Sequence, residues 1–293
     1  MRAFIRRLLG VPEPQPDWTR ERLVFALNEI SEMRQLLRIL LAESPRYKAQ
    51  VAQTSESFDV QWKLLPKGVQ LLGHPDFDRE SVALVERYTG LPSSWFRGKR
   101  VLDAGSGNGR WSYTLAKLGA QVTAMDQSES GLAEVKRVCS EFPGFRTIRH
   151  DLLLPLPADE PYDFVWNFGV VHHTGDTERA FGNVCGAVKK GGMIFTMIYG
   201  EPRYDNPGEY AELNSYTDLR RAVSGMSFEE RIAYLRSRFR EEDLNAWFDG
   251  ISPTINDLHR FDEVRAWLRR WNFTDIRRTF ENRNLFITAR RAP

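Results

Sequence analysis

The stretch Val101-Leu102-Asp103-Ala104-Gly105-Ser106-Gly107-Asn108-Gly109-Arg110-Trp111 decides the fold of this chain. Two apolar residues lead into an acidic residue, and three glycines then follow at alternate positions. Such an apolar run is typical of a buried parallel strand, and the glycines allow a tight turn into a helix that begins near Arg110. A glycine has no Cβ to block a ligand or to oppose a positive φ angle. The stretch therefore predicts a strand–turn–helix unit with a ligand site at its turn.

The glycine spacing separates two classes of nucleotide-binding fold. A dinucleotide fingerprint has the spacing G-x-G-x-x-G, but here the third glycine comes one position early. The carboxylate of Asp103, just before the turn, suits a cationic or amino-bearing ligand better than a phosphate. A nicotinamide-dependent dehydrogenase is therefore the weakest functional alternative.

Two further strand–helix units follow the first. A second apolar strand, 121–125, ends at Asp126, about twenty residues past the turn. A carboxylate at that position can accept hydrogen bonds from ribose hydroxyls. A helix over 131–142, a short strand over 145–149 and the residues His150-Asp151-Leu152 come next. The apolar strand 162–167 then leads into Phe168-Gly169-Val170-Val171-His172-His173.

These segments, in this order, resemble the motifs of the class I S-adenosylmethionine (SAM) methyltransferases. Residues 103–109 look like motif I (E/D-x-G-x-G-x-G), 122–128 like motif II and 162–167 like motif IV. The resemblance implies SAM as cofactor, with its amino acid end on the glycine loop, its ribose on Asp126, and its adenine near Asp151 and Leu152. The cofactor-binding residues so implied are Asp103, Gly105, Gly107, Gly109, Asp126, Gln127, Asp151, Leu152 and Asn167.

The rest of the chain fits an α/β architecture around this core. Alternating strands and helices with right-handed crossovers predict a doubly wound parallel sheet, whose ligands bind beyond the carboxyl ends of the strands. A helix over 176–188, a turn over 189–192 and a strand over 193–198 complete the alternating series. The resemblance implies a Rossmann-like seven-stranded sheet that ends in an antiparallel hairpin, here 273–280 and 285–289, after a helix over 261–271 capped near Asp262.

Four segments are expected along the chain. Residues 1–77 form an N-terminal helical extension, with a helix over 18–43, a linker at Ser44-Pro45, and Phe58 and Trp62 as lid residues. Residues 78–200 form the SAM-binding core, 201–260 a mostly helical cap inserted after the fifth strand, and 261–293 the helix and hairpin that complete the sheet. A sixty-residue excursion at the ligand edge indicates a lid or a substrate-binding cap.

Composition fits a globular protein of the cytoplasm. The chain has 293 residues, 42% of them hydrophobic, and a net charge of +2, which argues neither for nor against nucleic acid. The two cysteines are far apart in the sequence, so neither a disulfide framework nor a zinc site is supported. No run is long enough to span a bilayer. Residues 1–10 are compatible with a weak peripheral membrane contact. The helix expected over 18–43 is compatible with a homodimer contact.

Two adjacent histidines are the candidate catalytic bases. His172 and His173 follow motif IV, and imidazole titrates near neutrality, which suits proton removal from an acceptor. Such a base is needed only if the acceptor is a hydroxyl or a protonated amine. The candidate substrate contacts are Tyr199, Tyr204, Trp247 and His259, the last also a weaker candidate base.

The acceptor class follows from an absence in the sequence. Asn167-Phe168-Gly169-Val170 stands where methyltransferases of bases or glutamine often carry N/D-P-P-Y/F. We therefore expect methyl transfer to oxygen or nitrogen of a small-molecule, sugar or lipid-linked acceptor. A tRNA or other nucleic-acid methyltransferase, with the arginine-rich C-terminal third on phosphates, is the first alternative. A SAM-binding protein without transfer activity is the second.

Overall fold

The computed structural model describes residues 40–65, 76–157 and 161–293, together with positions 22, 25–26, 29–30, 33 and 36–37. The chain divides into two compact units, Met1–Lys48 and Ala49–Pro293. The described positions between 22 and 41 are helical, in keeping with part of the helix expected over 18–43. The amphipathic segment 1–10 and the proline-rich stop after it lie outside the described residues.

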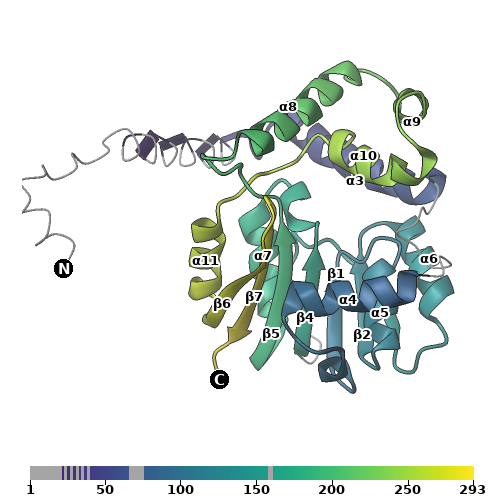
Figure 1. Ribbon diagram of the computed structural model, residues 1–293, viewed down its shortest axis with the longest axis vertical. Coiled ribbons are helices and arrows are strands. Elements are labelled where there is room, and N and C mark those ends of the chain that lie inside the picture. The colour runs from purple at the N-terminus through teal and green to yellow at the C-terminus, as the bar shows by residue number, and fades with distance from the viewer. Residues whose placement is uncertain are drawn as a thin grey trace, which may run out of the picture. The chain divides into compact units, whose positions relative to one another are not determined.

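The second unit is built on a seven-stranded sheet (Figure 1). Its strands are β1 Arg100–Ala104, β2 Gln121–Asp126, β3 Arg146–Arg149, β4 Tyr162–Phe168, β5 Val188–Ile198, β6 Phe273–Phe280 and β7 Leu285–Arg291. Their order across the sheet is β3-β2-β1-β4-β5-β7-β6, with β1 to β5 parallel and β7 antiparallel to both neighbours. The predicted Rossmann-like seven-stranded fold is confirmed.

Nine α-helices and three short 3-10 helices lie among the described residues with assigned bounds. The α-helices are α3 Pro45–Leu64, α4 Phe77–Thr89, α5 Arg110–Lys117, α6 Glu129–Cys139, α7 Thr177–Gly186, α8 Pro207–Ala222, α9 Phe228–Arg236, α10 Leu244–Ile251 and α11 Phe261–Arg270. The 3-10 helices are η1 Ser93–Phe96, η2 Val171–His173 and η3 Glu241–Asp243.

Alternation of side chains along the strands divides the core into two layers. Because successive residues of a strand point to opposite faces, Val101 and Leu102 enter different hydrophobic clusters. Val101 packs with residues of α4 and α5, such as Leu115, whereas Leu102 packs with residues of α7 and α11, such as Phe181. Helices α4 to α6 therefore cover one face of the sheet and α7 and α11 the other, which leaves the carboxyl ends of the parallel strands for the site.

The segment between β5 and α11 is helical, as expected for a cap. Helices α8, α9 and α10 share a small apolar core of their own around Leu235, Leu244 and Phe248. They lie beyond the carboxyl ends of the strands, next to α3 (Figure 1). Gln61 of α3 donates to the backbone carbonyl of Asn245 at the start of α10 over 3.3 Å, which ties the two helices together. The domain boundaries at 77, 200 and 260 stay predictions.

Three local expectations were wrong. Ser44-Pro45 is no linker but the start of α3: Ser44 Oγ accepts from the Tyr47 backbone N–H over 3.1 Å, and proline suits the first helical position because it lacks an N–H. Residues 189–192 are no turn but part of β5, where the register shifts opposite β4. Helix α11 begins at Phe261, as predicted, but its N-cap is Arg260 and not Asp262, and Glu263 accepts from the Arg260 backbone N–H over 3.4 Å.

Candidate functional site

The loop after β1 is shaped by glycines that no other residue could replace without strain. Gly105, Gly107 and Gly109 all have positive φ angles, of 86°, 52° and 92°. A Cβ on Gly105 would lie 2.4 Å from a methyl carbon of Val170, and one on Gly107 would lie 2.8 Å from Cζ2 of Trp62. The loop therefore combines a backbone conformation and a packing density that only glycine satisfies.

Asp126, at the end of β2, holds this loop in place. One of its carboxylate oxygens accepts from the Gly107 backbone N–H over 2.8 Å, and the other accepts from Ser128 N–H over 2.8 Å. Burial raises its pKa, and the backbone N–H groups oppose that rise. Each oxygen keeps a second lone pair, so the carboxylate can still accept a ligand hydroxyl.

A cavity of about 420 Å³ opens at the carboxyl ends of the strands. Its walls come from α3, the glycine loop, the ends of β2, β4 and β5, and helices α8 and α10 of the cap. Eight of the predicted cofactor, catalytic and substrate residues line it: Gly105, Gly107, Asp126, Gln127, Asp151, Leu152, His173 and Tyr199. Ser106, which also lines it, has a buried hydroxyl with no partner among the described residues. The sheet thus brings together side chains from strands far apart in the sequence.

Three other predicted cofactor residues lie behind the cavity wall. Asp103 is buried and accepts from the Ser112 hydroxyl over 2.6 Å, and burial raises its pKa to about 7. Asn167 donates to the Ala104 backbone carbonyl over 2.8 Å and accepts from a threonine of β5. Gly109 faces Val135 of α6. All three shape the loop or its support rather than the cavity surface.

Three predicted substrate residues also fall outside the cavity. Tyr204 is 57% exposed on the cap. Trp247 stacks on Phe239 with ring centres 4.1 Å apart, inside the cap's own core. His259 is buried, and its Nδ1 lies 3.1 Å from a carboxylate oxygen of Glu263. Helical periodicity and aromatic character gave no way to tell these packing residues from ligand contacts.

The two adjacent histidines have different surroundings. His173 lines the cavity, and its Nδ1 lies 2.8 Å from the backbone carbonyl of Ile255. Because a carbonyl only accepts, Nδ1 carries the proton and Nε2 is left as an acceptor; that atom has no partner among the described residues. His172 is buried away from the cavity, where its Nδ1 accepts from the Tyr199 backbone N–H over 3.3 Å and its ring stacks on Tyr199.

Burial lowers the pKa of both imidazoles. For His173, the nearby Asp249 carboxylate and the Ile255 carbonyl oppose this effect. His173 is therefore neutral at physiological pH and able to take a proton through Nε2. Of the two histidines, only His173 combines that state with a place on the cavity wall.

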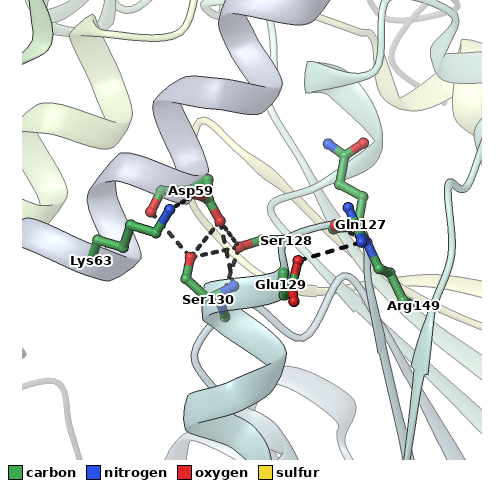
Figure 2. Close-up of polar contacts among 8 residues, drawn as sticks. Asp59, Lys63, Gln127, Ser128, Glu129, Ser130 and Arg149 are labelled. Atoms are coloured by element: carbon green, nitrogen blue, oxygen red, sulfur yellow. Dashed lines mark hydrogen bonds and ion pairs between the residues drawn. The ribbon is translucent and has the colours of Figure 1, made fainter.

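Helix α3 covers the glycine loop and is fastened beside it. Phe58 and Trp62 both line the cavity, and Phe58 meets the His173 ring edge-on at 4.9 Å. Figure 2 shows Asp59 pointing at the start of α6, where its Oδ1 accepts from the hydroxyls of Ser128, over 2.8 Å, and Ser130. Burial raises the pKa of Asp59, but hydrogen bonds from Lys63, Ser130 and Ser128 outweigh it and hold the value at about 2.

Asp59 and Asp249 are the functional candidates that sequence reasoning missed. Asp249 lies on α10, lines the cavity, and accepts from the Tyr199 hydroxyl over 2.8 Å. Neither residue belongs to a recognisable motif, and each reaches the site only because helices remote in sequence pack there. A carboxylate on the otherwise apolar helix α10, of sequence Leu-Asn-Ala-Trp-Phe-Asp-Gly-Ile, was the one available signal.

The comparisons with known proteins agree with this geometry. Residues 101–192, which include the glycine loop and the ends of β2 and β4, match the family described as a methyltransferase domain. This segment belongs to the class I SAM-dependent methyltransferases. The strand order, with its antiparallel β7, is the seven-stranded sheet that the sequence resemblance implied.

Curated relatives share the methyltransferase segment at moderate identity. A ubiquinone biosynthesis O-methyltransferase of Rhizobium etli is 36% identical over 101 residues, which are 33% of this chain and 40% of that relative. A ubiquinone biosynthesis O-methyltransferase of Ruegeria pomeroyi is 36% identical over 118 residues, 40% of this chain and 46% of that relative. The chain thus spans less than half the length of these relatives.

Solved methyltransferase structures share the fold over more of the chain. The N-methyltransferase NodS from Bradyrhizobium japonicum, in complex with S-adenosylhomocysteine, matches with a TM-score of 0.51 at 12% identity, over 82% of this chain and 100% of that one. This likeness includes regions outside the segment 101–192. It concerns the fold alone.

Proposed function

We propose that this protein transfers a methyl group from SAM to oxygen or nitrogen of a small-molecule acceptor. One observation carries the proposal: the glycine loop, Asp126 and His173 all line a single cavity of about 420 Å³, and the Nε2 of His173 has no hydrogen-bond partner among the described residues. Such a cavity places a cofactor site and a proton acceptor within one enclosure.

The residues of the loop side fit SAM. Gly105, Ser106 and Gly107 line the cavity, and the Ser106 hydroxyl has no partner among the described residues, so this loop would meet the amino acid end. Asp126 would accept from the ribose hydroxyls, and Asp151 with Leu152 would meet the adenine. When bound, SAM supplies a methyl group that its sulfonium already activates, so alignment and exclusion of water supply most of the catalysis.

His173 would act as the general base for a hydroxyl or protonated amine. Its proton sits on Nδ1, held by the Ile255 carbonyl, so the lone pair of Nε2 is directed away from that contact. Its lowered pKa keeps it unprotonated at neutral pH, as a base must be. General bases contribute about 10²–10⁴-fold to such reactions.

The enclosure of the cavity favours a small acceptor over a nucleic acid. Helix α3 and the cap helices α8 and α10 line it opposite the strand ends, which leaves little room for a duplex or a folded RNA. The similarity to O-methyltransferases of ubiquinone biosynthesis adds support for oxygen as the methylated atom. A sugar or a lipid-linked acceptor would bind through its reactive end.

The described helices and the two cysteines bear on where the protein works in the cell. No helix among the described residues is long and apolar enough to cross a membrane. Cys139 and Cys185 are both buried and free, which fits a reducing compartment, and we propose the cytoplasm. A homodimer and a peripheral membrane contact through residues 1–10 remain proposals from the sequence.

Isothermal titration of the purified chain with SAM, S-adenosylhomocysteine and NADH tests the proposal. We expect binding of SAM and S-adenosylhomocysteine with Kd of about 1–100 μM and no binding of NADH. A denatured sample is analysed for co-purified adenosyl ligand, which would otherwise mask binding. Absence of both bound and co-purified adenosyl compounds would contradict the proposal. Binding of SAM without transfer to any acceptor would favour the non-catalytic alternative.

A further inference from the structure

The cavity has a second half that the cofactor residues do not use. It lies between the ends of β4 and β5 and the cap, and its polar groups include His173, Tyr199 and Asp249. Aromatic and apolar side chains form much of the remaining wall there: Phe58, Trp111, Phe168, Val170, Met197 and Tyr216. Flat apolar walls with a few convergent polar groups are typical of sites that take an aromatic ring.

Asp249 is the one carboxylate that the cap places on this half of the cavity. It is positioned firmly, because α10 lies tightly on α8: a Cβ on Gly250 would be 2.5 Å from Cε1 of Tyr216. Its Oδ2 accepts from the Tyr199 hydroxyl over 2.8 Å, and Tyr199 in turn stacks on His172 with ring centres 3.8 Å apart. The carboxylate is thus oriented from the sheet side as well as from the cap.

Asp249 has no ion-pair partner among the described residues. The nearest candidate cation, Arg220, directs its Nε and one terminal nitrogen to the Gly250 backbone carbonyl, over 2.9 and 2.6 Å. Burial raises the pKa of Asp249, although His173, Tyr199 and Arg220 oppose the rise. The Asp249 side chain is half-buried, and a carboxylate partly withdrawn from water without a counterion is stabilised when a hydrogen-bond donor meets it; the open side of this carboxylate is the cavity.

We propose that Asp249, oriented by Tyr199, selects an aromatic acceptor that carries a second hydrogen-bond donor, a hydroxyl or a protonated amine, beside the atom to be methylated. The inference rests on the proposed function and names the substrate class of the same cavity. His173 Nε2 takes the proton of the reacting group, and Asp249 accepts from the second donor. An acceptor with a carboxylate or phosphate in that position is rejected, because like charges repel in a site of low dielectric.

A series of ortho-substituted phenols tests this selection. Phenol, catechol, 2-hydroxybenzylamine and salicylate share one methylatable hydroxyl and differ only in the neighbouring group: none, a hydroxyl, a protonated amine or a carboxylate. Methyl transfer from SAM is measured by mass spectrometry of the methyl ethers. We expect kcat/KM for catechol or 2-hydroxybenzylamine to exceed that for phenol and for salicylate at least tenfold. Whichever of the two is preferred identifies the second donor.

The variant Asp249→Asn separates selection from catalysis. The preference for the donor-bearing phenol over phenol should fall at least tenfold, with SAM affinity by titration within about twofold of wild type, because Asp249 lies outside the cofactor half. Tyr199→Phe should reduce the preference less. Asp218→Asn, an exposed carboxylate on α8 paired with Arg221, is the matched control and should keep the preference.

The outcomes distinguish this inference from the proposed function. If wild type does not bind SAM, the proposed function fails and the inference with it. If wild type binds SAM but prefers salicylate, treats the four phenols alike or methylates none of them, only the acceptor class is wrong. An unchanged preference in Asp249→Asn, with the variant folded and binding SAM, would likewise remove Asp249 from acceptor selection.

Discussion

Gly107 donates its backbone N–H to the carboxylate of Asp126 over 2.8 Å, which ties the glycine loop after β1 to the end of β2. The bond joins two of the three elements that would hold the cofactor. It also explains why the acidic residue at the tip of β2 matters before any ligand binds: the loop conformation depends on it. The same carboxylate accepts from Ser128 and so fixes the start of α6.

Replacement of Asp126 should therefore weaken SAM binding in two ways. Asp126→Ala removes a charge-assisted acceptor for the ribose and frees Gly107 N–H, so we expect at least a tenfold rise in the Kd for SAM, about 1.4 kcal/mol. Isothermal titration measures the change. Asp262→Asn, an exposed carboxylate on α11, serves as control. Wild-type affinity in a folded Asp126→Ala protein would show that the cofactor is bound elsewhere.

Gly107→Ala should disrupt the loop through both conformation and contact. The residue has a φ of 52°, and the new methyl group would lie 2.8 Å from Cζ2 of Trp62. We expect a lower melting temperature and at least a tenfold loss of SAM affinity. Gly225→Ala is the matched control, since Gly225 has a φ of 83° with nothing within 4 Å of the added Cβ; it should cost about 1 kcal/mol of stability without changing SAM affinity.

Combining Gly107→Ala with Trp62→Ala separates the effect of backbone strain from the effect of the steric contact. In the double variant the added methyl group has room but the backbone strain remains. SAM affinity should then recover in part relative to Gly107→Ala alone. No recovery would mean that Trp62 does not press on the loop as described.

The Asp59 contacts to Ser128 and Ser130 should slow release of the cofactor. Asp59→Ala removes the acceptor that fastens α3 beside the loop, so we expect SAM to dissociate several-fold faster in stopped-flow measurements of intrinsic tryptophan fluorescence. Lys63→Ala removes only the partner of an exposed ion pair with Asp59 and should change the rate less than twofold. Equal effects of the two variants would argue that the ion pair, and not the serines, fastens the helix.

His172→Gln and His173→Gln should have different consequences. His173→Gln removes the unpartnered imidazole Nε2 of a cavity-lining residue, so kcat with the preferred phenol should fall at least about 100-fold with little change in SAM affinity. His172→Gln should chiefly lower the melting temperature, because His172 accepts from the Tyr199 backbone and stacks on its ring. The opposite pattern, with kcat lost only in His172→Gln, would reassign the base.

Asp103 should make stability depend on pH. Burial raises its folded-state pKa from 3.8 to about 7, so the unfolded chain ionises first as pH rises, which lowers the free energy of the unfolded state relative to the folded state. This contribution to stability is complete below about pH 4, declines up to about pH 7 and is constant above it. Asp103→Asn should remove that decline, so its melting temperature relative to wild type should rise between pH 4 and pH 7. Parallel curves for the two proteins would contradict the assigned pKa.

Local sequence determined the sheet and the proposed cofactor half of the cavity. The strands could be predicted from apolar runs and from the alternation of apolar and polar residues. The glycine loop directly follows β1, and Asp126 is the last residue of β2. Both lie at the edge of the sheet where the parallel strands end. Their chemistry could be inferred because each lies next in sequence to the element that positions it. The positive φ angles of Gly105 and Gly107 agree with that reasoning.

Tertiary structure alone decided the proposed acceptor half of the cavity and the position of helix α3 over the glycine loop. Asp249 reaches Tyr199, fifty residues away, only because α10 packs above β5, and Asp59 meets Ser128 only because α3 lies over the loop. The tertiary structure also distinguishes His172 from His173: the two are adjacent in sequence, but only His173 lines the cavity. Side-chain direction in a short 3-10 helix and the docking of a cap depend on long-range packing, which no local pattern of residues encodes.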